Sequence, residues 1–290
     1  MELLSSPLLL PAQQRAILQG QGVSYTRQVA RNVVPVVAAE AAALVAALLL
    51  ASVLRQWVTG ETAGLVGYGW VVLPVYLAAA TVSKLLPGWG LGAVEEFRRV
   101  VLSVLGAFVV TTMGLWMTRV NVGDAVASRL TMAAAGLLAV GLVPLARWQV
   151  KSLLTRADRW GVPAVVYGAG LLGSRIVRQL QEERGIGYRP VAVFDDDLDA
   201  WGGFLDTIPI VGDTAQVAPE APVAFLALPT TDSARHVALL EGPLSCYRTV
   251  VIIPDLIDAP SLWVTPRDFA GVLGLELTST LTRPVPRVVK

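Results

Sequence analysis

The sequence predicts an α-helical membrane bundle followed by an α/β domain with a parallel sheet. Two observations lead to this prediction. Four long apolar stretches fill the first half of the 290 residues, and from about residue 163 short apolar runs alternate with helical segments. Only 16% of the residues are charged, whereas soluble domains usually carry about 25%. Because the shortage of charge falls mostly before residue 150, the two halves of the chain suit different environments.

Each of the four apolar stretches is long enough to cross a bilayer as a helix, which takes about 20 residues. They run over residues 33–54, 65–83, 100–117 and 130–148. A cleaved signal peptide does not explain the first stretch, because it begins too late and three more follow it. We therefore expect four transmembrane helices, with the lipid bilayer as a partner.

Lysine and arginine flank these stretches unevenly, which predicts an orientation. The N-terminal segment, the loop after the second stretch and the segment after the fourth are rich in them, and the other two loops are poor. The rich segments hold Arg15, Arg27, Arg31, Lys84, Arg98, Arg99, Arg147, Lys151, Arg156 and Arg159. Both termini are therefore expected to be cytoplasmic. The single cysteine, Cys246, excludes an internal disulfide and agrees with a reducing compartment.

The first stretch carries two further features. Ala39, Ala43, Ala47 and Ala51 form a small-residue face, which either lets another helix approach closely, as in a homo-oligomer, or reflects alanine-rich composition alone. Glu40 is an intramembrane carboxylate and by default a functional candidate. Since it lies less than two turns from the cytosolic end, we expect it to have a structural partner or an interfacial position.

The loop between the second and third stretches is predicted to contain an interfacial helix near residues 91–99. Leu91, Val94 and Phe97 share one helical face, and Glu95 and Arg99 have the i,i+4 spacing of an ion pair. Such a segment should lie in the cytoplasmic interface and turn into the third span, with Trp89 as an anchor among the lipid headgroups.

The second half of the chain opens with a glycine-rich turn. The apolar strand over residues 164–168 runs into Gly168-x-Gly170-x-x-Gly173 and then into a helix over 171–183. Gly168 permits a tight turn, Gly170 lets the backbone come close to a diphosphate, and Gly173 lets the helix pack near the strand. The N–H groups at the start of the helix then attract an anion.

An acid at the end of the second strand completes this pattern. Asp195 ends the strand over 190–195, where it should hold a ribose, and Asp196 follows it. Strand, turn, helix, second strand and acid together predict a Rossmann-like domain with Gly168, Gly170, Gly173, Asp195 and Asp196 as its cofactor-binding residues. The ligand stays open between a nucleotide, such as a UDP-sugar or NAD(P), and a turn that serves folding alone.

The other chemistry-bearing residues give weaker signals. Thr230, Thr231 and Asp255 follow predicted strands near the carboxyl edge of the sheet, where ordinary loop polarity is the stronger interpretation. Cys246 is expected to be a buried structural thiol, and the single histidine, His236, a packing or surface residue. One histidine excludes a multi-histidine metal site, and a net charge of +1 argues against nucleic acid as a partner. We assign no catalytic residue and no metal ligand.

The order of these parts resembles a known family of membrane enzymes. Besides the four spans, the chain carries WGLGAVEEFRRV before the third span, PLARWQVKSLL at the end of the fourth, and then WGVPAVVYGAG, VFDDD, IPIVGD and DFAGVLGLEL. In this order they resemble the N-terminal part of large polyprenyl-phosphate sugar-1-phosphate transferases, similar to undecaprenyl-phosphate galactose phosphotransferase. The resemblance implies a multi-pass protein of the bacterial inner membrane that takes part in exopolysaccharide or O-antigen synthesis.

In that family a C-terminal catalytic domain with an Asp-Glu pair transfers phosphosugar from a UDP-sugar to a lipid phosphate with Mg²⁺. The sequence ends over residues 282–290, about where that domain would open. We therefore expect this polypeptide to be inactive alone, to need Mg²⁺ only through the catalytic domain, and to associate with such a domain. The glycine turn and the acids after the second strand match the family's non-catalytic Rossmann-like domain.

The expected organisation is a cytosolic segment over residues 1–32, a transmembrane domain over 33–154, a Rossmann-like domain over 155–277 and a linker stub over 278–290. The expected function is a membrane-anchored, non-catalytic scaffold or regulatory part of such a transferase that senses a nucleotide or nucleotide sugar. Two alternatives stay open: the N-terminal part of a membrane nucleotide-sugar 4,6-dehydratase, and a membrane-bound NAD(P)-binding oxidoreductase. The absence of lysine between Lys151 and Lys290 counts against a Tyr-x-x-x-Lys oxidoreductase.

Overall fold

The structure is a computed structural model that describes residues 25–60, 69–118, 129–228, 233–253, 265–269 and 272–278. These residues form two compact units. The Rossmann unit takes the described residues of Met1–Gln28, Trp89–Gly92 and Gly161–Lys290, and the helical unit takes those of Val29–Gly88 and Ala93–Trp160. The predicted boundary after residue 154 falls inside a helix that extends to Arg156.

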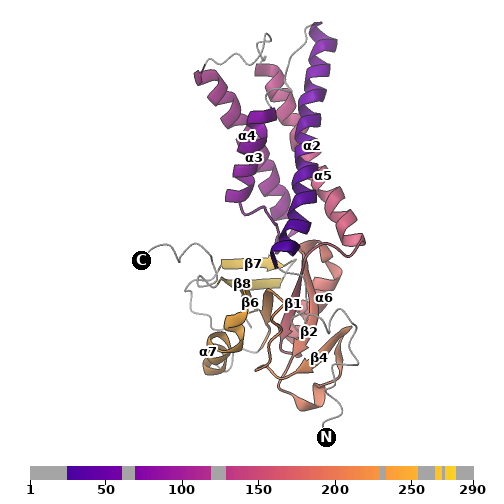
Figure 1. Ribbon diagram of the computed structural model, residues 1–290, viewed down its shortest axis with the longest axis vertical. Coiled ribbons are helices and arrows are strands. Elements are labelled where there is room, and N and C mark those ends of the chain that lie inside the picture. The colour runs from indigo at the N-terminus through magenta and orange to yellow at the C-terminus, as the bar shows by residue number, and fades with distance from the viewer. Residues whose placement is uncertain are drawn as a thin grey trace. The chain divides into compact units, whose positions relative to one another are not determined.

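The helical unit is built from long apolar helices. They are α2 (Tyr25–Thr59, whose first residues belong to the Rossmann unit), α3 (Gly69–Val82), α4 (Ala93–Thr118) and α5 (Arg129–Arg156). The helices run alternately up and down (Figure 1), so that the starts of α2 and α4 and the ends of α3 and α5 lie at the same end of the unit.

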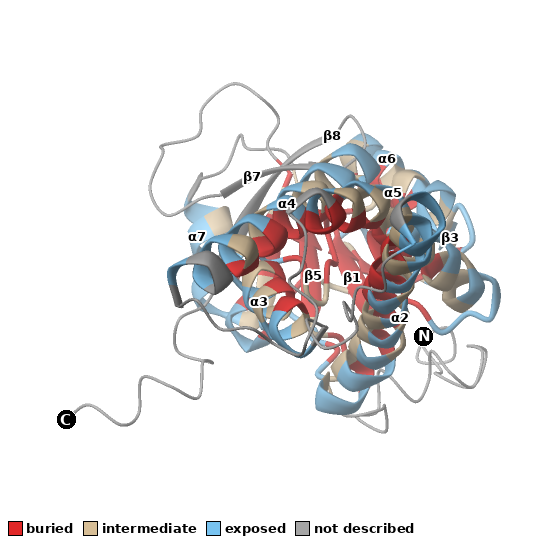
Figure 2. Ribbon diagram, turned by 90° about the horizontal axis from the view of Figure 1, so that it is seen from above, coloured by how far each residue is buried: buried red, intermediate tan, exposed pale blue. Residues whose placement is uncertain are grey.

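Three of these helices are long and apolar enough to cross a membrane, over Tyr25–Val58, Ala93–Gly114 and Thr131–Arg156. The second predicted span is represented by α3, a shorter apolar helix, and residues 65–68 of that span lie outside the described residues. Each helix has a buried side and an exposed side (Figure 2), and the exposed sides also carry apolar residues such as Leu50, Val53 and Val110. Helices that are apolar all round are typical of membrane spans.

The small-residue face of α2 packs inside the helical unit. Ala43, Ala47 and Ala51 are buried, together with Leu44 and Leu48 on the same side of the helix. These alanines therefore let the helices of one chain approach each other closely. The face is not free to form a homo-oligomer, so the prediction of an oligomer loses its support from this feature.

A buried network of charged residues joins three helices of the unit. Arg147 on α5 donates from Nη1 to Glu40 Oε1 on α2 at 2.5 Å and from Nε to Glu96 Oε1 on α4 at 2.6 Å. Lys151 Nζ lies 2.6 Å from Glu96 Oε2. The two cations and two carboxylates balance, which is how charges become tolerable in a low-dielectric interior. The expectation of a structural partner for Glu40 is confirmed.

Because of this network, fewer free cations flank the spans than the sequence suggests. Arg147 and Lys151 contributed to the predicted orientation, but both are buried in ion pairs inside the helical unit. Arg147 Nη2 also donates to the carbonyl of Leu85 at 2.8 Å, which holds the turn after α3. Of the flanking cations at the end of α5, Arg156 and Arg159 remain exposed.

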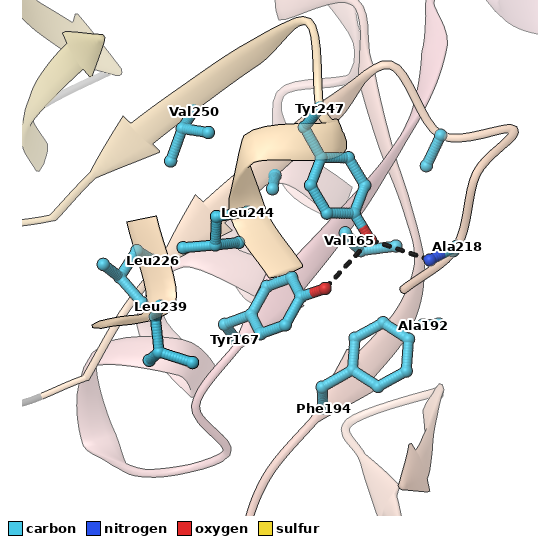
Figure 3. Close-up of a cluster of buried hydrophobic side chains, with 12 residues drawn as sticks. Val165, Tyr167, Ala192, Phe194, Ala218, Leu226, Leu239, Leu244, Tyr247 and Val250 are labelled. Carbon is cyan, nitrogen blue, oxygen red and sulfur yellow. Dashed lines mark hydrogen bonds between the residues drawn. The ribbon is translucent and has the colours of Figure 1, made fainter. Parts of the chain in front are cut away.

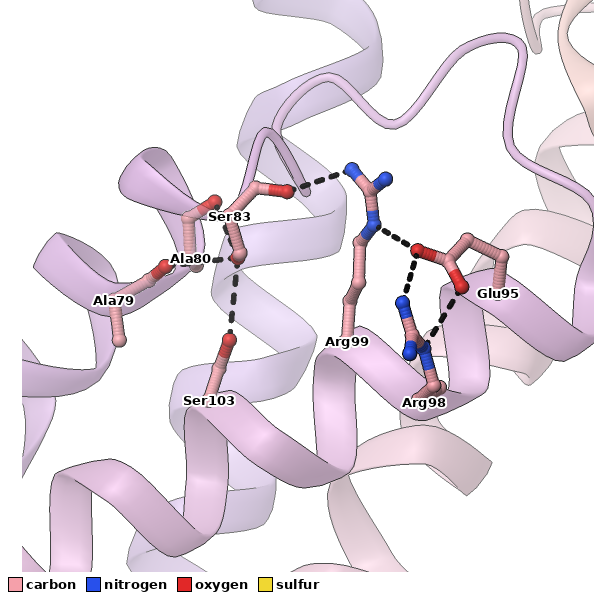
Figure 4. Close-up of polar contacts among 7 residues, drawn as sticks. All are labelled: Ala79, Ala80, Ser83, Glu95, Arg98, Arg99 and Ser103. Carbon is pink, nitrogen blue, oxygen red and sulfur yellow. Dashed lines mark hydrogen bonds and ion pairs between the residues drawn. The ribbon is translucent and has the colours of Figure 1, made fainter. Parts of the chain in front are cut away.

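The segment predicted as an interfacial helix is the start of a longer helix. The structure has helix α4 beginning at Ala93 and continuing without interruption to Thr118, while Leu91 lies before it and is buried. Val94 and Phe97 are exposed, so the three predicted apolar residues do not share one environment. The Glu95–Arg99 ion pair is present at 2.7 Å, and Arg99 also donates to the carbonyl of Ser83 (Figure 4).

The Rossmann unit contains an eight-stranded sheet in the order β3-β4-β2-β1-β5-β6-β8-β7. Its strands are β1 (Val162–Tyr167), β2 (Tyr188–Phe194), β3 (Phe204–Leu205), β4 (Ile208–Gly212), β5 (Val223–Leu226), β6 (Thr249–Ile252), β7 (Thr265–Phe269) and β8 (Val272–Thr278). Helix α6 (Leu171–Glu182) joins β1 to β2, and α7 (Ser233–Glu241) joins β5 to β6.

The predicted parallel sheet is correct for the centre and incomplete at the edges. Strands β4, β2, β1, β5 and β6 are mutually parallel, as strand–helix alternation requires. Strand β3 pairs antiparallel with β4, and at the other edge β8 pairs antiparallel with β6 and with β7. Residues 206 and 207 alone join β3 to β4, without a crossover helix, and we did not expect these edge strands.

Four residues between α3 and α4 belong to the Rossmann unit. The N–H of Gly90 donates to the carbonyl of Ile186 at 2.8 Å, just after the C-terminal end of α6. A Cβ at Gly90 would lie 2.8 Å from the Tyr188 hydroxyl, so only glycine fits this approach. Trp89 is buried and meets the Tyr25 ring edge-on at 6.1 Å. The expectation of Trp89 as a headgroup anchor is therefore wrong.

The connection from β4 to β5 has no helix, and two tyrosines hold it against the sheet (Figure 3). Ala218 N–H donates to Tyr247 Oη at 2.8 Å, the two hydroxyls lie 2.9 Å apart, and Tyr167 Oη donates to the carbonyl of Gln216 at 2.8 Å. Because Tyr167 uses its proton on that carbonyl, Tyr247 donates to Tyr167. The surrounding core includes Val165, Phe194 and Leu226.

Candidate functional site

The glycine turn lies at the point where the sheet changes its direction of growth. From β1 the chain moves to β2 on one side, whereas β5 lies on the other side of β1. Open α/β sheets bind ligands outside the carboxyl ends of the strands at such a switch point. Gly168 directly follows β1, and the N–H of Ala227, directly after β5, donates to the carbonyl of Tyr167 at 2.8 Å.

Two of the three glycines are required by the backbone itself. Gly168 has φ of +109°, and a Cβ there would lie 2.6 Å from the carbonyl oxygen of Ala227. A Cβ at Gly173 would overlap the carbonyl oxygen of Gly168, so α6 can begin this close to β1 only with glycine. These contacts are those expected from the sequence for the tight turn and for helix packing.

Gly170 differs from the other two, because a Cβ there would meet nothing within 4 Å. It is the N-cap of α6 and makes no side-chain cap hydrogen bond, and the first helical bond runs from Ser174 N–H to its carbonyl at 2.9 Å. The N–H groups of Leu171, Leu172 and Gly173 precede that bond and have no intrahelical acceptor. The helix start thus offers N–H donors and a positive dipole beside open space, which suits an anion.

Asp195 is tied to the glycine turn. Its Oδ2 accepts from the N–H of Ala169 at 2.5 Å, and its Oδ1 accepts from the N–H of Asp197 at 2.9 Å. The indole N–H of Trp201 donates to the backbone carbonyl of Asp195 at 2.7 Å. Each carboxylate oxygen keeps a further lone pair for a hydroxyl. Asp195 therefore fixes the turn, and its role toward a ribose stays a prediction.

Asp196 faces two partners that the sequence did not reveal. Its carboxylate accepts from the N–H and the hydroxyl of Thr214, both at 2.8 Å, and it forms an ion pair with Arg235 on α7. Thr214 follows β4, and Arg235 lies far away in the sequence, so only the fold brings them together. No spacing rule predicts such a contact from a single sequence.

The remaining candidates do not join this site. Thr230, Thr231 and Asp255 lie outside the described residues. Cys246 is exposed, so the expectation of a buried thiol is wrong. His236 is half-buried on α7. Among the described residues, no group of three or more His, Cys, Asp and Glu side chains is placed to hold a metal ion.

Comparisons with known proteins add the following. Residues 89–241, just over half of the chain, match the family described as CoA-binding domain. No curated protein matches the chain. Two solved structures of RSP, a Rex-family repressor, one of them in complex with β-NADH, are 16% and 12% identical, with TM-scores of 0.31 and 0.32. The matches cover 56% and 59% of this chain and 82% and 81% of theirs.

With TM-scores this low, the two RSP structures say nothing about the ligand of this chain. The family match is different, because it covers more than half of the chain: it begins at Trp89, in the segment Trp89–Gly92 of the Rossmann unit, and continues through the glycine turn to the end of α7. On this match, the chain belongs to the CoA-binding domain family.

Proposed function

We propose that the Rossmann unit binds a nucleotide that carries a diphosphate, with the diphosphate at the start of α6. The main support for the proposal is a contrast between the glycines. At Gly168 and Gly173 a Cβ would clash with neighbouring backbone, whereas Gly170 leaves open space beside the first N–H groups of α6. An anion at that place is stabilised by the N–H donors and by the helix dipole.

Coenzyme A is the first candidate ligand, because the chain belongs to the CoA-binding domain family. UDP-sugars and NAD(P) also contain a diphosphate, and they are the other candidate ligands. In this proposal Asp195, held by the Ala169 N–H, accepts from a ribose hydroxyl through a remaining lone pair.

We further propose that the helices anchor this unit in a bacterial inner membrane, with both termini in the cytoplasm. There the chain would act as a regulatory or scaffolding part of a polyprenyl-phosphate sugar-1-phosphate transferase. Three helices of spanning length and apolarity support the anchor. Domains of this family occur in the N-terminal parts of sugar transferases, which supports the second part. The nucleotide would then report on the supply of activated precursors to the associated catalytic domain.

The ligand proposal is tested by thermal unfolding of the purified full chain with CoA, UDP-glucose, NAD⁺ or NADP⁺ at millimolar concentration. At least one ligand should raise the unfolding temperature, since a ligand that binds only the folded state stabilises by RT ln(1 + [L]/Kd). Gly170→Asp should abolish the increase, because the added carboxylate occupies the open space and repels the diphosphate.

Gly185→Asp is the matched control. Gly185 lies in the same unit, has open space around its Cβ position and needs no positive φ, so this variant adds the same charge away from the turn. It should keep the full ligand-induced increase. If no ligand stabilises the wild type, or if both variants respond like the wild type, the diphosphate site is not at Gly170.

A further inference from the structure

Exposed cations collect at one end of the helical unit. Helices α2 and α4 start there and α3 and α5 end there (Figure 1). The exposed cations at this end are Arg31, Lys84, Arg98, Arg156 and Arg159. Arg98 shares Glu95 with Arg99. Within the described parts of the chain, no ion pair is found for the other four.

Among the described residues, the opposite end is poor in cations. Its described residues include Arg55, near the end of α2, and Arg129, at the start of α5. The guanidinium of Arg55 is only partly exposed and donates to the Thr131 hydroxyl at 3.3 Å. Large apolar side chains dominate this end instead, with Trp57 89% and Trp70 86% exposed. The helical unit is therefore electrostatically asymmetric along its length.

Exposed apolar side chains lie within about one helical turn of the cations, on every helix. Val34 follows Arg31, Val82 precedes Lys84, and Leu153 precedes Arg156. Phe97 is exposed beside Arg98, and Trp148 is exposed on α5. An arginine or lysine that emerges beside apolar groups can leave its stem among acyl chains and extend its charge to a phosphate. Nucleic acid and acidic proteins would offer no such apolar layer.

We infer that this end of the helical unit binds anionic phospholipid headgroups, selecting phosphatidylglycerol-like lipids over zwitterionic ones. The inference rests on the proposed membrane insertion and adds a lipid preference to it. The occupant is identified by charge complementarity: four unpaired cations face the headgroup layer, and anionic leaflets attract such residues. The buried pairs of Arg147 and Lys151 take no part, because their charges are already neutralised by Glu40 and Glu96.

The test uses the full chain reconstituted in phosphatidylcholine bilayers, with spin-labelled phosphatidylglycerol or spin-labelled phosphatidylcholine as the probe. The motionally restricted fraction of each probe measures its association with the protein. We expect wild type to prefer phosphatidylglycerol by at least about twofold at low salt. The preference should fall when salt is raised from about 0.05 to 0.5 M, since salt screens exposed charges.

In the variant Arg31→Gln/Lys84→Gln/Arg156→Gln, the ratio of restricted phosphatidylglycerol to restricted phosphatidylcholine should fall close to one. Its control, Arg175→Gln/Arg178→Gln/Arg184→Gln, removes as many exposed cations from the Rossmann unit and should keep the preference. Arg31→Lys/Arg156→Lys keeps the charges and should also keep it. These comparisons separate the location of the charge from the total charge.

A salt-independent ratio of one in wild type, with restricted phosphatidylcholine present, would overturn the lipid preference and leave membrane insertion intact. The lipid preference would also be overturned if both triple variants lost the preference for phosphatidylglycerol to the same extent. If neither probe is restricted, the chain does not contact lipid and the proposed anchor fails as well. The wild-type salt titration decides the matter even if the triple variant fails to fold.

Discussion

Tyr167 and Tyr247 show how much a connection without a helix depends on single side chains. Both rings are buried, and their hydroxyls link Ala218 and Gln216 to the sheet. Burial raises the pKa of both phenols above the usual value of about 10, because an ionised phenol in this core would lose its contact with water.

This shift predicts a loss of stability at alkaline pH. Below about pH 10 both phenols are protonated in the folded and the unfolded chain, so their contribution is constant. Above that pH the unfolded chain ionises first, and the free energy of unfolding falls by up to about 1.4 kcal/mol per pH unit for each phenol. Denaturant unfolding between pH 8 and 11 should show this fall, and Tyr167→Phe should make it shallower. An unchanged slope in that variant would contradict the assignment.

The glycine turn shows what single residues reveal in advance and what they do not. The roles of Gly168 and Gly173 follow from sequence spacing, because any strand–turn–helix unit of this kind brings the same backbone atoms together. The partner of Asp195 was not predictable, since its bond to Ala169 N–H depends on the register of β1 and β2. Arg235 meets Asp196 only because α7 returns over the sheet.

Among the secondary-structure elements, α5 has the largest structural role in the helical unit. Its Arg147 contacts α2 through Glu40, α4 through Glu96 and the turn after α3 through the carbonyl of Leu85. Packing of small residues brings these helices close, and the ion pairs fix their register. One side chain thereby specifies how three helices and a turn meet.

The variant Arg147→Met should destabilise the helical unit by about 3–5 kcal/mol, because it leaves the buried carboxylate of Glu40 without a counter-charge, while Glu96 keeps Lys151. Glu40→Gln/Arg147→Met removes the charge of Glu40 as well and should recover part of the loss, since Lys151 and Glu96 stay paired. The stability of both variants is measured by unfolding in mixed micelles with increasing SDS, with circular dichroism as the signal. Arg98→Met removes an exposed cation and should leave the midpoint unchanged. If Arg147→Met were as stable as the wild type, the network would not hold the helices together.

The sequence predicted elements best where one pattern dominates. The centre of the sheet and α6 were predicted within a few residues, because apolar runs and the glycine turn are local signals. The start of α4 was misjudged: a charged segment after glycines looks like an interfacial helix, but nothing stops it from continuing into the apolar stretch. Strands β7 and β8 were not predicted, because they pair antiparallel at the edge of the sheet, outside the strand–helix alternation on which the prediction rested.

At the scale of the whole molecule, one family match spans elements of both units. Residues 89–241 include the segment Trp89–Gly92, helices α4 and α5, and the chain from β1 to α7. The matched family therefore covers apolar helices as well as strands of the Rossmann unit. In the proposed function, the helices hold the chain in the membrane and the glycine turn binds the diphosphate.

The most direct test of this account is hydrogen–deuterium exchange of the full chain with and without the nucleotide that stabilises it most. If the diphosphate lies at the start of α6, the amides of residues 169–174 should exchange more slowly with ligand, and Gly170→Asp should remove the effect. Protection confined to other parts of the chain, with residues 169–174 unchanged at saturating ligand, would contradict a diphosphate site at the glycine turn.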